Sequence, residues 1–148
     1  MARLYTALLL AVMATCTAIA SENEDRAKEI FNQYVSLSDK FDPAVADLYS
    51  DEAKIKNTRT YPNGETRVMT FEAKKYKALI RTAMPLAKAR GDTNKYTEVT
   101  YLEKDSKVTI TATRFSNLKK YSSPITLVVG ADPEGKWRIL EETSQSKP

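Results

Sequence analysis

The feature that most constrains the fold is a change in the spacing of apolar residues along the chain. Before Gly91, except in a predicted hairpin at residues 53–69, apolar residues recur every three or four positions in long segments, which is the repeat of a helix with one buried face. From Asn94 onward they alternate with polar residues in short segments separated by turns, which is the repeat of strands buried on one side. These patterns predict an α+β fold with helices on one face of a curved antiparallel sheet.

The helical half is predicted to contain three helices. Residues 21–40 open with a capping box in which Ser21 and Glu24 satisfy the first free amides. Asp42 and Pro43 are typical of a second, short helix start, because aspartate caps amides and proline has no N–H to leave unpaired. A third helix follows a predicted hairpin whose strands are residues 53–61 and 65–69.

The third helix is expected to have Thr70 as its cap and to end no later than Gly91, with Pro85 kinking or ending it. Four strands should follow as an antiparallel meander. Their predicted ranges are 95–103, 107–115, 121–130 and 136–143.

The N-terminus has the pattern of a secretory signal peptide. Arg3 precedes an apolar segment, and Ala18 and Ala20 form a small-x-small cleavage site before Ser21. We therefore expect residues 1–20 to be removed and residues 21–148 to form one exported domain, periplasmic or secreted, with no inserted membrane segment. The alternative is a lipoprotein anchored through Cys16, but the residues before that cysteine fit a lipoprotein box poorly.

Composition excludes several classes of chemistry. The chain has no histidine, and its one cysteine lies in the predicted signal peptide. The mature domain therefore lacks cysteine nucleophiles, histidine-based triads and ordinary zinc ligands. No calcium loop or phosphate-binding glycine loop is present, so we expect no metal and no cofactor. The net charge of +4 is small and the charges are interspersed, which argues against nucleic-acid binding.

Three segments in this order resemble the nuclear transport factor 2-like superfamily, which includes ketosteroid isomerases and SnoaL-like polyketide cyclases. They are residues 41–53, the long helix ending near Gly91, and residues 135–139 with Trp137 facing inward. The resemblance implies a cone-shaped sheet around a pocket that the first and third helices close. This fold hosts enzymes, binding proteins and interaction domains, so it does not by itself identify the function.

The alternation of the strands predicts which polar side chains enter the cone. Asn57, Arg59, Arg114 and Glu141 are expected to face inward, together with Tyr34 from the first helix. We predict that these residues form a ligand site, with Arg114 and Glu141 paired as a fork.

The resemblance places the aspartate base of ketosteroid isomerases near Asn57, and Tyr34 resembles their oxyanion tyrosine. An amide cannot accept and return a proton near neutral pH. We therefore expect no catalytic residues, and binding of a small, largely apolar ligand with an anionic end.

Two alternatives remain open. One is an isomerase-, cyclase- or dehydratase-like enzyme acting on a small hydrophobic substrate, which a carboxylate inside the cone without a basic partner would favour. The other is an interaction module or homodimer that uses the open sheet face. The threonines expected on that face are Thr97, Thr109, Thr111, Thr113 and Thr126.

Overall fold

The structure is a computed structural model and describes residues 22–148. The predicted signal peptide, its cleavage site and Cys16 lie outside the described residues. An N-terminal helix covers residues 22–39. The elements after it are η1 (Pro43–Leu48), β1 (Tyr49–Thr60), β2 (Thr66–Glu72), α2 (Ala73–Arg90), β3 (Asn94–Lys104), β4 (Lys107–Ser116), β5 (Tyr121–Ala131) and β6 (Trp137–Ser146).

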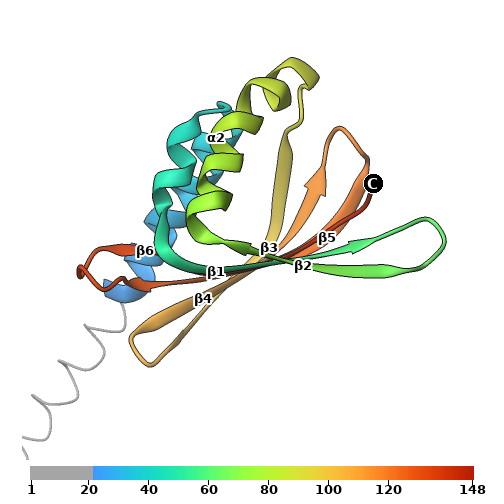
Figure 1. The fold of residues 1–148 in the computed structure, drawn as a ribbon. Helices are drawn as coiled ribbons and strands as arrows, with labels where there is room; N and C mark the ends of the chain where they lie inside the picture. Colours follow the sequence, from blue (N-terminus) through green and yellow to red (C-terminus); the bar gives the residue numbers. More distant parts are fainter. Residues whose placement is uncertain (1–21) are drawn as a thin grey trace, which may run out of the picture.

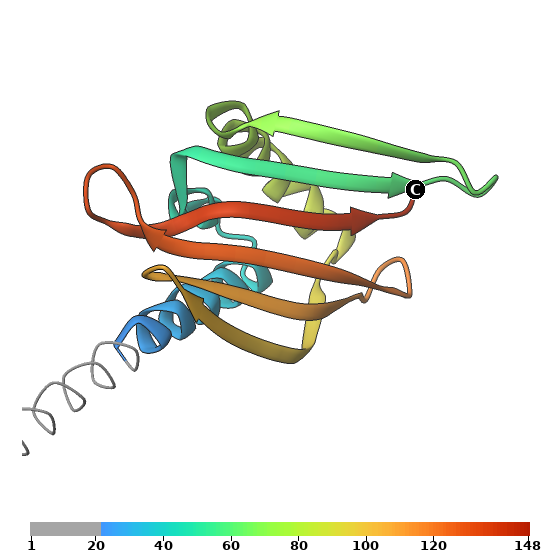
Figure 2. The same ribbon diagram turned by 90° about the horizontal axis from the view of Figure 1, so that it is seen from below.

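The strands form one curved, unclosed sheet in the order β2-β1-β6-β5-β4-β3, and the helices cover its concave face (Figures 1 and 2). This arrangement confirms the predicted α+β fold. The sheet is mixed, because β1 pairs with β6 in parallel while the other neighbours are antiparallel. The parallel pair joins the first strand to the last and so brings both halves of the chain into one sheet.

The helix starts follow the local sequence in one case and depart from it in another. The Asp42 carboxylate accepts a hydrogen bond from the Ala44 amide at 2.9 Å, as expected of the cap before Pro43. Thr70, in contrast, is not a cap, because β2 continues to Glu72 and α2 begins at Ala73. Strand pairing with β1 extends through this segment and prevails over the local capping preference.

The end of α2 agrees with the prediction for Gly91 and decides the role of Pro85. Pro85 lies inside the helix and does not end it. Gly91 adopts the left-handed conformation at φ 63°, and its amide caps carbonyls of the last turn. A residue without a Cβ takes this conformation at little cost, so the helix ends here.

An irregularity in β6 changes which of its side chains face the helices. Val129 pairs with Ile139, but the preceding residue Val128 pairs with Glu141, so Leu140 is an extra residue in the ladder. Such a bulge shifts the alternation of the strand by one position. Ile139 and Glu142 are both buried on the concave side, whereas Glu141 is exposed.

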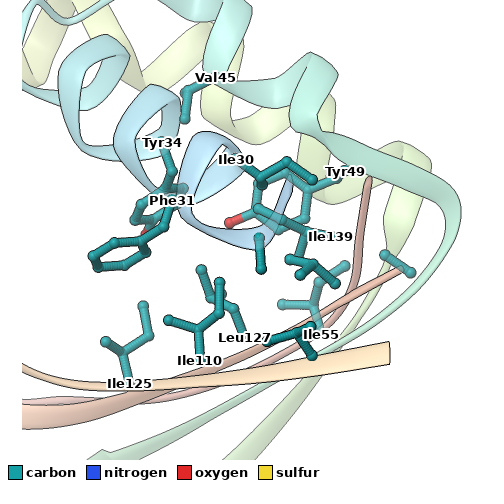
Figure 3. Packing of buried hydrophobic residues seen from close by; sticks show 14 of the residues in the cluster. Ile30, Phe31, Tyr34, Val45, Tyr49, Ile55, Ile110, Ile125, Leu127 and Ile139 are labelled. Carbon is teal, nitrogen blue, oxygen red and sulfur yellow. The ribbon is translucent and has the colours of Figure 1, made fainter. Parts of the chain in front are cut away.

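The core lies between the helices and the part of the concave face that they cover, which we call the closed end (Figure 3). Ile110, Leu127 and Ile139 come from three adjacent strands and are almost completely buried. Phe31 and Tyr34 reach them from the N-terminal helix. Trp137 is half-buried at the edge of this core, as its predicted inward orientation requires.

Candidate functional site

The concave face has a polar cavity at the end where β1 and β6 finish. It has a volume of about 220 Å³, and we call it the mouth pocket. The C-terminal end of α2, the β4–β5 turn and the C-terminus lie at this end of the molecule (Figure 1). The charged and polar side chains that line the pocket are Arg59, Asp92, Asn94, Arg114, Ser116, Lys119, Tyr121, Ser146 and Lys147.

The mouth pocket carries an excess of positive charge. Four of its lining residues are basic, and Asp92 is the one acidic residue among them. Within residues 22–148, none of these four basic side chains forms an ion pair. Unpaired cations around a concave surface favour the binding of an anion.

Arg114 is held by groups on the neighbouring strands. Its Nη2 donates to the Gln145 carbonyl oxygen at 2.7 Å and to Ser123 Oγ at 3.3 Å. The positive charge also acts on the interior: burial raises the pKa of Tyr34 well above its usual range, and Arg114 acts on that pKa in the opposite direction. These two hydrogen bonds therefore hold the Arg114 guanidinium group between the mouth pocket and the buried aromatic residues.

Arg59 contributes a donor that has no acceptor in the part of the chain that the structure describes. Its Nε atom is buried and makes no hydrogen bond, while its guanidinium group lies 5.7 Å from the ring centre of Tyr61. A buried donor without a partner is costly.

Asn57 links the mouth pocket to the interior through two serines of β6. Its Nδ2 donates to Ser144 Oγ at 3.0 Å, and Ser146 Oγ donates to its Oδ1 at 2.8 Å. Ser146 lines the mouth pocket, and Ser144 is buried. The inner side of β6 is therefore polar from the pocket inward.

A buried carboxylate lies further along the same side of β6. Glu142 is 2% exposed and accepts hydrogen bonds from the hydroxyl groups of Tyr49 and, at 3.2 Å, Tyr76. Burial raises the pKa values of both tyrosines well above their usual range, and the nearby carboxylate raises them further. No cationic side chain forms an ion pair with Glu142 among the described residues.

The expectation that Glu141 faces inward is wrong. The bulge at Leu140 turns Glu141 to the convex face and puts Glu142 on the concave face in its place. The predicted fork between Arg114 and Glu141 is therefore not formed. Glu141 and Glu142 are adjacent, so a shift of one residue in the strand exchanges which of them is buried.

The remaining predicted site residues separate into two groups. Arg59 and Arg114 line the mouth pocket together, and Asn57 is joined to it through Ser146. Tyr34 is instead part of the buried aromatic cluster, with its ring centre 6.2 Å from that of Phe31. Lys119 and Lys147 were not singled out in the sequence, because they follow strand ends where alternation gives no orientation.

The convex face of the sheet carries the predicted threonines. The strand registers pair Thr97 with Thr113, and Thr111 with Thr126. Thr126 also pairs with Thr143 on the next strand. Cross-strand threonine pairs stabilise a sheet, so this surface has a structural explanation, and dimerisation through it remains a prediction.

Comparison with known proteins supports the fold. No protein-family model matches the sequence, and no curated protein is similar to it in sequence. Solved structures with the nuclear transport factor 2-like fold do match. A nuclear transport factor 2-like protein with a cystatin-like fold from Novosphingobium aromaticivorans is 16% identical, with a TM-score of 0.62 over 89% of this chain and 86% of that chain.

Two further matches have been linked to enzymes. A proposed dehydratase from the nuclear transport factor 2-like family of Streptomyces avermitilis is 12% identical, with a TM-score of 0.60 over 84% of this chain and 96% of that chain. A proposed ketosteroid isomerase from Shewanella frigidimarina is 13% identical, with a TM-score of 0.55 over 80% of this chain and 94% of that chain. At these identities the likeness shows the fold alone.

Proposed function

We propose that this nuclear transport factor 2-like domain is a non-catalytic binding protein for a small organic anion, which the mouth pocket holds. The observation that carries the proposal is the presence of Arg59 and Arg114 in one cavity without a carboxylate partner for either among the described residues. Removing a charged side chain from water is costly unless a partner of opposite charge is present, and the cost grows with burial. An incoming anion would supply a partner for the charge of both arginines.

The size and lining of the mouth pocket limit the ligand. Its volume of about 220 Å³ is smaller than the roughly 300–1,000 Å³ of pockets for drug-sized molecules. The closed end of the cone is already filled by core side chains. A short molecule with one carboxylate, phosphate or sulfonate group fits these limits, and its apolar part would lie against Tyr121.

Replacing Arg114 with methionine tests the proposal, because methionine keeps much of the apolar stem and removes the guanidinium group. The probes are benzoate, phenyl phosphate and benzenesulfonate, with benzamide as the neutral analogue, and binding is measured by titration calorimetry. We expect R114M to weaken binding of the preferred anion by about 10- to 100-fold, the usual effect of losing a hydrogen bond to a charged group. Benzamide should be affected much less.

Arg26→Met provides a matched control, because Arg26 is an exposed arginine on the N-terminal helix, outside the mouth pocket. This variant should bind every probe as the wild type does. Equal losses for the anions and for benzamide in R114M would show that Arg114 only supports the structure. A wild type that binds none of the three anions would overturn the proposal.

A second candidate function is proton transfer by Glu142, and it rests on a different observation. This carboxylate is buried beside two tyrosine hydroxyl groups without an ion-pair partner among the described residues, and buried carboxylates in such surroundings serve as acids or bases in enzymes. The test is exchange of α-protons of levulinate in deuterated water, followed by nuclear magnetic resonance. An enzyme of this type should accelerate the exchange and lose most of that rate in E142Q, whereas a binding protein should show the buffer rate in both.

A further inference from the structure

Helix α2 exposes an apolar strip on the side that faces away from the sheet. Tyr76, Ile80 and Met84 pack against the core on its inner side. On the outer side, Leu79 and Leu86 are 50% and 54% exposed, although they are large apolar residues. They are seven residues apart, so they lie on one line along the helix, two turns from each other.

Small residues continue this strip between and beside the two leucines. Ala78, Thr82 and Ala89 are exposed on the same outer side, since a helix advances by about 100° per residue. Beyond the first turn of the helix, the outer strip therefore contains few groups that require water. In the first turn, Lys75 lies on the same side and pairs with Glu72. We call the two leucines and the three small residues the α2 strip.

The helix is basic along its whole length and carries no acidic residue. Lys74, Arg81 and Lys88 follow one another at intervals of seven and form a row beside the α2 strip. Arg90 lies near the other side of the strip at the C-terminal end of the helix. An apolar strip between basic residues is thus presented to solvent.

Only part of this positive charge is neutralised inside the molecule. Lys77 pairs with Asp51 at 2.6 Å, and Arg81 pairs with Asp47 at 2.6 Å. Lys75 pairs with Glu72 at 2.9 Å. The other basic residues of the helix, which are Lys74, Lys88 and Arg90, form no ion pair with any residue of the described range 22–148.

We propose that the α2 strip is a docking surface for an anionic lipid membrane. The leucines would enter the interface between headgroups and acyl chains, while Lys74, Lys88 and Arg90 contact the anionic headgroups. This combination of leucines and flanking basic residues is the pattern of helices that lie in a membrane interface. A second copy of the chain fits less well, because two copies of the strip would bring the same unpaired cations together.

This binding is peripheral. None of the helices in the described part is long and apolar enough to cross a bilayer. The inference is also independent of the mouth pocket, because no residue of the α2 strip lines that cavity. Failure of one proposal therefore leaves the other intact.

Co-sedimentation with lipid vesicles tests the inference. The full-length gene is expressed, and the N-terminus of the purified protein is determined by mass spectrometry, so that all variants are compared with the same N-terminus. The vesicles contain either phosphatidylcholine alone or phosphatidylcholine with one-third phosphatidylglycerol. We expect the wild type to bind the anionic vesicles at least ten-fold better, and this preference should fall as salt is raised.

Two double variants separate the apolar and the charged contributions. Leu79→Ser with Leu86→Ser, and Lys74→Gln with Lys88→Gln, should each weaken binding to anionic vesicles about ten-fold or more. The matched control is Leu102→Ser with Lys104→Gln, because Leu102 is 68% exposed on β3 and is not part of the strip. This control should bind as the wild type does.

Three results would overturn the inference. One is equal wild-type binding to both kinds of vesicle, and another is binding by both α2 variants that matches the control. The third is a dimer, detected by light scattering, that the leucine variant loses while no variant binds vesicles, because this would identify a second copy as the occupant. If the leucine variant fails to fold by circular dichroism, vesicle binding by the lysine variant tests the inference instead. Both of its substitutions replace one exposed polar side chain with another, so we expect this variant to fold.

Discussion

The two ends of the concave face differ in charge: the closed end contains a buried carboxylate, and the open end contains arginines. At the closed end, Glu142 is buried beneath the helices and is held by the hydroxyl groups of Tyr49 and Tyr76. At the open end, Arg59 and Arg114 line a cavity without a carboxylate partner among the described residues. A direct ion pair between one of these arginines and Glu142 would have neutralised both charges, but none is formed among the described residues.

Strand β6 contributes side chains both to the buried core and to the mouth pocket. After the bulge in β6, Glu142, Ser144 and Ser146 occupy successive inward positions, which run from the core to the mouth pocket. Asn57 bridges the two serines. The closed end is thus stabilised by neutral hydrogen-bond donors, and the cations remain free for a ligand.

Replacing Tyr49 with alanine should have the largest effect, because it tests whether the closed end is a rigid core. Tyr49 is 1% exposed and donates a hydrogen bond to Glu142. Removal of a buried aromatic side chain costs about 3–5 kcal/mol of unfolding free energy, and urea denaturation measures it. Tyr121→Ala, at the half-exposed mouth pocket, is the matched control and should cost less than about 1.5 kcal/mol. Equal losses would contradict the distinction between the two ends.

A smaller effect is expected from alkaline pH, and it should again arise from the closed end. Burial raises the pKa values of Tyr34, Tyr49 and Tyr76 above the ordinary value of 10.0. A raised pKa means that the folded protein holds the proton more tightly, so this stabilisation is complete below about pH 10 and is lost as the pH rises above that value. Each such tyrosine should lower the unfolding free energy by up to about 1.4 kcal/mol per pH unit.

Urea denaturation between pH 8 and pH 11 measures this dependence. Tyr49→Phe removes one of the titrating hydroxyl groups and should make the decline less steep above pH 10. A decline of the same slope in this variant would mean that the loss of stability comes from other groups.

Residues with a clear local pattern were predicted correctly from the sequence. Alternation along β1 and β4 oriented Arg59 and Arg114, and both line one pocket. The cap at Asp42 and the helix end at Gly91 also follow from properties of single residues. These features could be read in advance because their causes lie within a few residues of each position.

The sequence by itself determined the α+β class, the order of the elements and the inward orientation of Arg59 and Arg114, because periodicity and capping are local properties of the chain. Only the tertiary structure decided that Glu142, rather than Glu141, is buried. The bulge at Leu140 arises from the pairing of β6 with β5, and the parallel pairing of β1 with β6 joins residues far apart in the chain. A one-residue shift of this kind leaves no mark in the alternation of a single strand, since it depends on which partner residues the sheet brings opposite to it.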